Sequence, residues 1–214
     1  MTTNALLSDG DRQHFYDEIG NLNLAPLWER LHALVPKSPP TSAVPVKWDY
    51  DGVVREHLMR AGEVVTAAEA ERRVLILENP ALRGEARITH SLYAGLQLVK
   101  PGEIAPAHRH TQSALRFVIE GGGAYTAVEG ERVEMYPGDL VLTPSLRWHD
   151  HGNDSDRPIV WLDGLDIPIV GFLSAGFAEP GRAATQDEAR PAGDSEARFG
   201  NNLRPVDWRP SDQA

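Results

Sequence analysis

Between Ile88 and about residue 175, the sequence consists of short apolar segments with a period of two. The segments are SLYAGLQLV, ALRFVIEG, GAYTAVEG, RVEMY, DLVLT and IVWLDGLD, and Pro-Gly, Glu-Gly and Gly-Gly signals separate them. No helix-like segment lies between them. Because isolated short strands leave unpaired edges, this pattern predicts an antiparallel sandwich or a small closed barrel, whose interior can hold a site.

The part of the chain before these strands has helical spacing instead. One amphipathic helix is predicted between Pro26 and Pro36, where apolar residues recur at helical intervals. These residues are Leu27, Trp28, Leu31, Leu34 and Val35. A proline-rich segment, KSPPTSAVPV, then predicts an extended linker. Thr66 and Glu69 form a capping-box pattern, which predicts a short helix that runs into the strand-like VLIL.

The composition divides the chain into three parts. We expect residues 1–85 to form a helical extension that packs on the barrel, and residues 86–178 to form the barrel itself. Residues 179–214 are interpreted as a polar tail or linker, because large apolar side chains are sparse there. They are Phe199, Leu203, Val206 and Trp208.

Several classes of function are excluded by composition. The 214 residues suit one medium domain with an extension, and the absence of cysteine excludes disulfides, thiolate metal sites and cysteine nucleophiles. With 31 acidic and 21 basic residues, the net charge of -10 argues against non-specific binding of nucleic acid. The uncharged stretch Ile167–Ala178 is too short to cross a bilayer, and the N-terminus has no signal-peptide pattern. We therefore expect a cytoplasmic protein without a membrane partner.

Four of the eight histidines form two His-x-His pairs in the strand-rich part: His108 with His110, and His149 with His151. Because side chains alternate along a strand, each pair points to one face, and two strands that face each other in a barrel can bring the imidazoles together. Nitrogen ligands suit iron, copper, nickel or zinc. The alternative is that some of these residues are ordinary surface or core histidines.

The same alternation extends the candidate site. If one regular strand follows Pro106, Arg116 shares a face with the first histidine pair, and a buried arginine needs an anion. Its partner is either Asp163 or a substrate carboxylate, and we favour the substrate because a guanidinium binds carboxylate bidentately. Trp161 lies on the same face as Asp163, and we expect it to line the substrate pocket.

On another strand, Tyr93, Gly95 and Gln97 share a face and would supply an aromatic wall, a space and an amide. Ordinary filling of the barrel is the alternative for these residues. The glycines Gly121–Gly123 are interpreted as a strand connection and not a phosphate loop, because no helix pattern or lysine follows. A serine hydrolase is not favoured, because the sequence contains no Gly-x-Ser-x-Gly.

Two segments resemble the paired motifs of the cupin superfamily: PGEIAPAHRHTQSALRFVIEG and PGDLVLTPSLRWHDHGN. The flanking LILENPALRG, ITHSLYAGLQL and WLDGLDIP resemble the gentisate 1,2-dioxygenase family, which includes salicylate and 1-hydroxy-2-naphthoate dioxygenases. The resemblance implies a mainly β fold, a cupin of the double-stranded β-helix or jelly-roll type, with an N-terminal α-helical extension. It covers the N-terminal cupin half of a family whose members have two barrels.

The resemblance also implies a metal site. His108, His110 and His149 match the ligand positions, and His151 then lies outside the ligand set. Ala114 stands where a generic cupin has a glutamate, as in this family's three-histidine Fe(II) sites. With dioxygen as co-substrate, such a site would open the ring of a 2-hydroxybenzoate between the carboxyl-bearing and hydroxyl-bearing carbons. Gentisate would give maleylpyruvate.

Further site residues follow from the same resemblance. The catalytic side chains would be His151, Asp163 and Arg116, and His151 and Asp163 are expected to form a hydrogen-bonded pair near the substrate hydroxyl. The substrate would contact Arg72, Tyr93, Gln97, Arg116 and Trp161.

Other outcomes remain open at this stage. One is a different cupin enzyme, such as an isomerase or a dioxygenase that cleaves salicylate or 1-hydroxy-2-naphthoate. The other is a non-catalytic module that binds aromatic acids. We also expect a homo-oligomer, because a barrel face left free by the missing second barrel can pair with another subunit.

Overall fold

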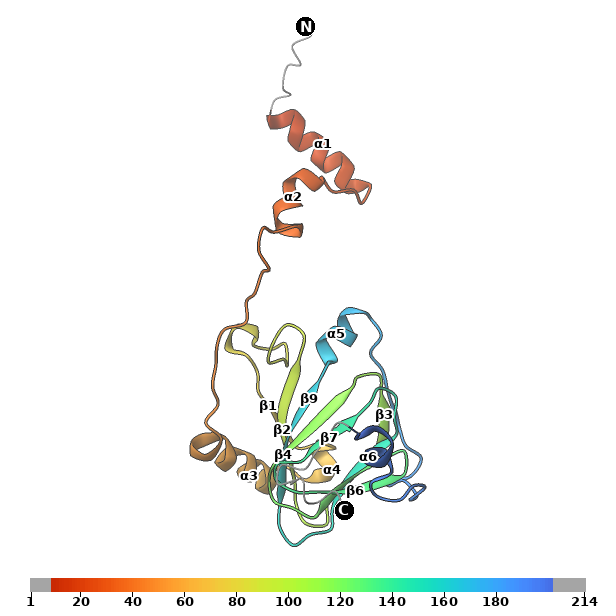
Figure 1. Ribbon diagram of the computed structural model, residues 1–214. Helices are drawn as coiled ribbons and strands as arrows, with labels where there is room; N and C mark the ends of the chain where they lie inside the picture. The colour runs from red at the N-terminus through yellow and green to blue at the C-terminus, as the bar shows by residue number, and fades with distance from the viewer. Residues whose placement is uncertain (1–8, 202–214) are drawn as a thin grey trace. The chain divides into compact units, whose positions relative to one another are not determined.

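The computed structural model describes residues 9–201 and divides into two units, Met1–Thr41 and Ser42–Ala214 (Figure 1). In the first unit, helix α1 spans Asp9–Asn21 and α2 spans Leu27–Leu34, so the helix predicted after Pro26 is present. Neither helix buries a residue. The Trp28 indole donates a hydrogen bond of 2.8 Å to the Tyr16 hydroxyl and joins the two helices.

The second unit is built on two five-stranded antiparallel sheets, which confirms the predicted antiparallel sandwich. The first sheet consists, in order, of β1 (Val74–Ile76), β2 (Tyr93–Val99), β9 (Ile159–Leu165), β4 (Ala114–Glu120) and β7 (Leu140–Thr143). The second consists of β10 (Ala178–Pro180), β3 (Ile104–His110), β8 (His149–Asn153), β5 (Ala124–Val128) and β6 (Glu131–Met135). Since β1 belongs to the first sheet, the sandwich begins before the expected boundary at residue 86.

Alternation along the strands separates two apolar clusters. Residues of both sheets form the inner cluster: Val99, Val118, Ala124, Met135, Ile159 and Trp161. The outer cluster covers the other face of the first sheet beneath helix α3 (Arg55–Val64) and consists of Leu58, Leu96, Leu98 and Val160. Every second residue of β2 and β9 thus faces the interior between the two sheets, and these positions supply both core residues and site residues.

Short helical elements complete the connections. Thr66 and Glu69 form the predicted capping box at the start of α4 (Ala67–Ala70), with reciprocal hydrogen bonds between side chains and main chain. The remaining elements are the π-helical turn η1 (Tyr50–Val54), the 3-10 turn η2 (Pro80–Leu82), α5 (Ile167–Phe172) and α6 (Asp194–Phe199). No helix in residues 9–201 is long and apolar enough to span a membrane.

Residues 178–190, called the strap below, are bound to the barrel and are not the expected polar tail. Strand β10 pairs with β3, and Gly181 donates a hydrogen bond of 2.6 Å to the Ala107 carbonyl. Gln186 then crosses β8 and β5, donating to the Asp150 carboxylate and the Ala127 carbonyl at 2.9 and 3.1 Å. Of the tail residues singled out above, Leu203, Val206 and Trp208 lie outside the described residues.

Candidate metal centre

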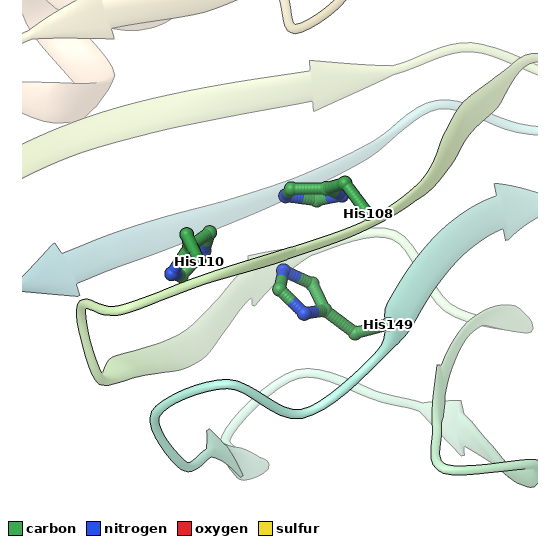
Figure 2. A group of neighbouring side chains, drawn as sticks. All are labelled: His108, His110 and His149. Carbon is green, nitrogen blue, oxygen red and sulfur yellow. The ribbon is translucent and has the colours of Figure 1, made fainter. Parts of the chain in front are cut away.

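Three of the four strand histidines converge on one point (Figure 2). His108 on β3 lies directly opposite His149 on the neighbouring strand β8, and His110 follows His108 on the same face. The potential ligand atoms of the three rings all lie within 4.8 Å of one another. The two histidine pairs therefore belong to adjacent strands of one sheet, so the expectation that their strands face each other across the barrel is wrong.

Backbone carbonyls orient all three rings. In each case Nδ1 lies within hydrogen-bond distance of a carbonyl two residues away in the chain, and because a carbonyl can only accept, this contact places the proton of His110 and His149 on Nδ1. The pairs are His108 with Pro106 at 3.1 Å, His110 with Gln112 at 2.8 Å and His149 with Arg147 at 2.8 Å. Nε2 of His110 and His149 then keeps its lone pair, which is the arrangement found in metal-binding histidines, whereas Nδ1 and Nε2 of His108 lie 2.5 and 3.1 Å from Nη2 of Arg72.

A metal ion fits this donor set. Nε2 of His149 is buried and has no hydrogen-bond partner among the described residues, so an ion at this point would satisfy it. Burial, followed by the charges of neighbouring rings and arginines, lowers the pKa of His149 to about 2. Burial and the Arg72 charge lower the pKa of His108 to about 3, and burial also lowers that of His110. All three rings are thus neutral near pH 7, as ligands must be.

His151 lies on β8 two residues beyond His149, and its ring nitrogens are not part of the three-histidine group. Its Nδ1 lies 2.9 Å from the Thr126 hydroxyl on β5. The predicted hydrogen bond between His151 and Asp163 is not formed, because Nε2 of His151 has no partner among the described residues and Asp163 pairs with Arg116. Burial, and next the Arg116 charge, lower the pKa of His151, so this ring is also neutral.

Arg116 and Asp163 form a buried ion pair, with 3.3 Å between Nε and Oδ1. The two residues are direct partners in the register of β4 and β9, and Arg116 also donates from Nη1 to the Thr143 hydroxyl at 2.7 Å. Of the two anions considered for Arg116, the structure contains the carboxylate of Asp163. Burial raises the pKa of Asp163 against the opposing effect of the Arg116 charge.

The single regular strand assumed from His108 to Arg116 is not formed. Strand β3 ends at His110, and β4 begins at Ala114 in the other sheet. Arg116 still faces the interior, but it does so from the sheet opposite the histidines. The site is therefore enclosed by both sheets.

Arg72 lies next to the histidines, although it comes from the segment before β1. Its Nη2 is 2.5 Å from Nδ1 of His108 and donates to the Pro106 carbonyl at 3.1 Å. Burial lowers the pKa of Arg72, and the Glu71 and Asp163 charges oppose this change. The interior thus holds the guanidinium groups of Arg72 and Arg116 and the carboxylate of Asp163.

The other expected pocket residues lie on β2 and β9. Gln97 and Trp161 are direct register partners, and both are buried. The Trp161 ring meets the His151 ring edge-on, with 5.6 Å between centroids. Tyr93 is half-buried at the start of β2, and burial together with the Asp163 charge raises its pKa to about 12.

Comparison with known proteins agrees with this arrangement. The family model described as "Cupin domain" matches residues 95–165. Gentisate 1,2 dioxygenase 1 of Aquipseudomonas alcaligenes is 55% identical over 93% of this chain and 57% of its own length. The crystal structure of a salicylate 1,2-dioxygenase from Pseudaminobacter salicylatoxidans superposes with a TM-score of 0.82 at 39% identity, covering 94% of this chain and 57% of that one. The chain belongs to the gentisate 1,2-dioxygenase family of cupins.

This cupin spans about half the length of the curated relatives it matches. A gentisate 1,2-dioxygenase of Ralstonia sp, for example, is 44% identical over 83% of this chain but only 50% of its own length. The match corresponds to one cupin unit, and the complete metal group, Arg72 and the Arg116–Asp163 pair all lie within it.

Two polar residues of this cupin site were absent from the sequence-based set. Thr126 contacts His151, and Thr143 accepts a hydrogen bond from Arg116. Alternation alone places Thr126 inward on the segment GAYTAVEG. Its contact with His151 depends on the register of β5 against β8, which the sequence does not state.

Proposed function

We propose that the protein is an Fe(II)-dependent dioxygenase that opens the ring of 2-hydroxyaryl carboxylates, with gentisate cleaved to maleylpyruvate. The observation that carries this proposal is the group of three neutral histidines, whose potential ligand atoms all lie within 4.8 Å of one another and whose Nδ1 atoms each contact a backbone carbonyl. His108, His110 and His149 would hold the iron. Their nitrogen donor set is one that suits iron.

Iron bound by three neutral ligands keeps its full charge and open positions, and would supply a common binding point for the substrate and dioxygen. The overall reaction breaks the carbon–carbon bond between the carboxyl-bearing and hydroxyl-bearing carbons. Both oxygen atoms of dioxygen enter the product, so gentisate and dioxygen together account for every atom of maleylpyruvate. No further reductant is needed.

The substrate carboxylate is drawn by the charge of the site. Arg72 and Arg116 together carry two positive charges, and Asp163 compensates for one. The site therefore has an excess of positive charge, to which the iron would add its own, and a guanidinium can bind the carboxylate of an aromatic acid in a bidentate manner. Tyr93, Gln97 and Trp161 are proposed to line the ring-binding space, with His151 at the hydroxyl end. In support, a solved structure of the salicylate 1,2-dioxygenase relative contains gentisate.

The experiment is oxygen uptake by the iron-loaded protein with gentisate, salicylate and 1-hydroxy-2-naphthoate. We expect one dioxygen consumed per gentisate, together with the ring-opened product. The three acids differ by a hydroxyl or a fused ring, so their relative rates define the preference of the pocket. Absence of uptake with all three acids, in protein that contains stoichiometric iron, would contradict the proposal.

The second candidate is a non-catalytic module that binds aromatic acids. It would use Arg72 and Arg116, whose guanidinium groups can hold a carboxylate without any turnover. Binding of gentisate without oxygen uptake would support it. A homo-oligomeric state and a cytoplasmic location stay predictions, which size-exclusion chromatography with light scattering and cell fractionation would test.

A further inference from the structure

The environment of His151 determines which of its ring nitrogens carries the proton. Thr126 and His151 are direct partners in the register of β5 and β8, so both side chains point inward from adjacent strands. Both are almost completely buried, and Nδ1 of His151 lies 2.9 Å from the Thr126 hydroxyl oxygen. Either atom could donate in this hydrogen bond, depending on the tautomer of the ring.

A second contact of Thr126 decides between the two directions. Its hydroxyl lies 3.2 Å from the sulfur of Met135, which is buried at the end of β6. A thioether sulfur only accepts, so the hydroxyl proton points to Met135 and the hydroxyl oxygen accepts from Nδ1 of His151. In this direction the Thr126 hydroxyl makes two hydrogen bonds, one as donor to Met135 and one as acceptor from His151. The reverse direction would lose the contact with sulfur and place a buried N–H at Nε2, where no acceptor is present among residues 9–201.

Nε2 of His151 lies at the end of the ring opposite the Thr126 contact, and it is buried without a hydrogen-bond partner among residues 9–201. In the Nδ1–H tautomer this atom is an acceptor, which can take a donor from a bound molecule.

We infer that Thr126, with its hydroxyl proton directed to Met135, holds His151 as the Nδ1–H tautomer, so that Nε2 accepts a hydrogen bond from a hydroxyl group of the bound aromatic acid. The identity of that donor rests on the proposed function, whereas the tautomer does not. Thr126 is a positioning residue, since it acts through His151. It replaces Asp163 as the group that orients this ring.

The tautomer is tested by nitrogen-15 NMR of histidine-labelled, zinc-loaded protein, with the His151 signals assigned from their loss in His151→Asn. We expect a protonated Nδ1 and an unprotonated Nε2 in the wild-type protein. Met135→Leu keeps the volume but removes the sulfur acceptor, so the hydroxyl becomes free to donate to the ring and the Nε2–H form should increase. A wild-type ring protonated at Nε2 would overturn the inference, as would an unchanged ring in Met135→Leu.

The acceptor role is tested by binding of salicylate and benzoate to the zinc-loaded protein, since benzoate lacks the hydroxyl donor. Thr126→Val should raise the Kd of salicylate about tenfold and leave that of benzoate unchanged, whereas Thr126→Ser should stay within about twofold of wild type. Equal effects on both ligands would overturn the inference. These outcomes do not require turnover, so absent oxygen uptake with the expected binding pattern would refute only the proposed ring cleavage. Should Thr126→Val fail to fold, Thr126→Ser and Met135→Leu still decide the matter.

Discussion

Replacing Asp163 by asparagine should destabilise the protein strongly, because this carboxylate balances a buried cation. Asp163 and Arg116 are each about 5% exposed, and 3.3 Å separates their charged atoms. In Asp163→Asn the Arg116 guanidinium would keep its hydrogen bond to Thr143 but lose its counter-ion, while Arg72 adds a second positive charge nearby. The perturbation therefore leaves an uncompensated buried charge.

The expected size of the effect follows from that geometry. Breaking one side of a buried pair costs about 3–5 kcal/mol of unfolding free energy, which corresponds to a fall in Tm of roughly 6–20 °C for a domain of this size. Removing both charges in Arg116→Leu, Asp163→Leu should recover most of the loss, because no unpaired ion remains. The double variant is thus the matched control for the single one.

The assay is urea unfolding of metal-free protein followed by tryptophan fluorescence, with and without salicylate. The unpaired Arg116 in Asp163→Asn should accept the ligand carboxylate, so salicylate should stabilise this variant more than the wild type. A single variant within about 1 kcal/mol of wild type, or a double variant as unstable as the single one, would refute the reasoning.

Three further predictions concern stability. The pKa of His149 is about 2 in the folded state and about 6.5 in the unfolded state, so the unfolded state binds more protons below pH 6.5. The unfolding free energy of the metal-free protein should therefore fall by up to about 1.4 kcal/mol per pH unit from this residue as pH falls below 6.5. Thermal melts at pH 7.5, 6.5 and 5.5 measure this loss, and a Tm that does not change with pH would contradict it. Gln186→Leu removes the side-chain amide that donates to the buried Asp150 carboxylate and leaves only the backbone N–H of residue 186 as donor, so it should cost about 2 kcal/mol in urea unfolding and weaken iron binding because Asp150 adjoins His149. Wild-type stability would disprove this role of the strap. Gly121→Ala should unfold at a clearly lower temperature than Gly122→Ala. The reason is that Gly121 has a φ of +87° and that a Cβ at this position would lie 2.3 Å from the Pro158 carbonyl oxygen. Equal melting temperatures of the two variants would contradict this explanation.

The strands and their inward faces were predictable because they depend on local pattern. Period-two alternation and turn residues fix where a strand ends and which side chains share a face. Gln97, Trp161 and Arg116 are buried at inward positions for this reason. The convergence of His108, His110 and His149 follows from the same rule, since only inward residues meet.

The path of the chain between faces was not predictable in the same way. Alternation continues from His110 to Arg116, although residues 111–113 turn the chain from one sheet to the other. The inner faces of both sheets point to the same interior. The alternation of side chains therefore does not distinguish one continuous strand from two strands joined by such a turn. The site residues were therefore predicted together for a partly wrong reason.

The strap and the partner of His151 depend on long-range contacts. Residues 178–190 are bound to the barrel by hydrogen bonds of the main chain and of a side-chain amide. Because these contacts need no apolar side chains, the polar composition of the strap resembles that of a free tail. The contact between Thr126 and His151 requires the register of two strands that are separated in sequence. Register is set by the whole sheet and is not visible in either segment alone.

The proposed centre has three histidine ligands, and not four, for one iron. Anaerobic titration with Fe(II), followed by desalting and metal analysis, tests it on wild type and four single alanine variants. We predict one iron per chain in the wild type and in His151→Ala, and loss of stoichiometric iron in His108→Ala, His110→Ala and His149→Ala, because two imidazoles hold Fe(II) poorly. Full iron content in any of those three variants, or its loss in His151→Ala, would contradict the account.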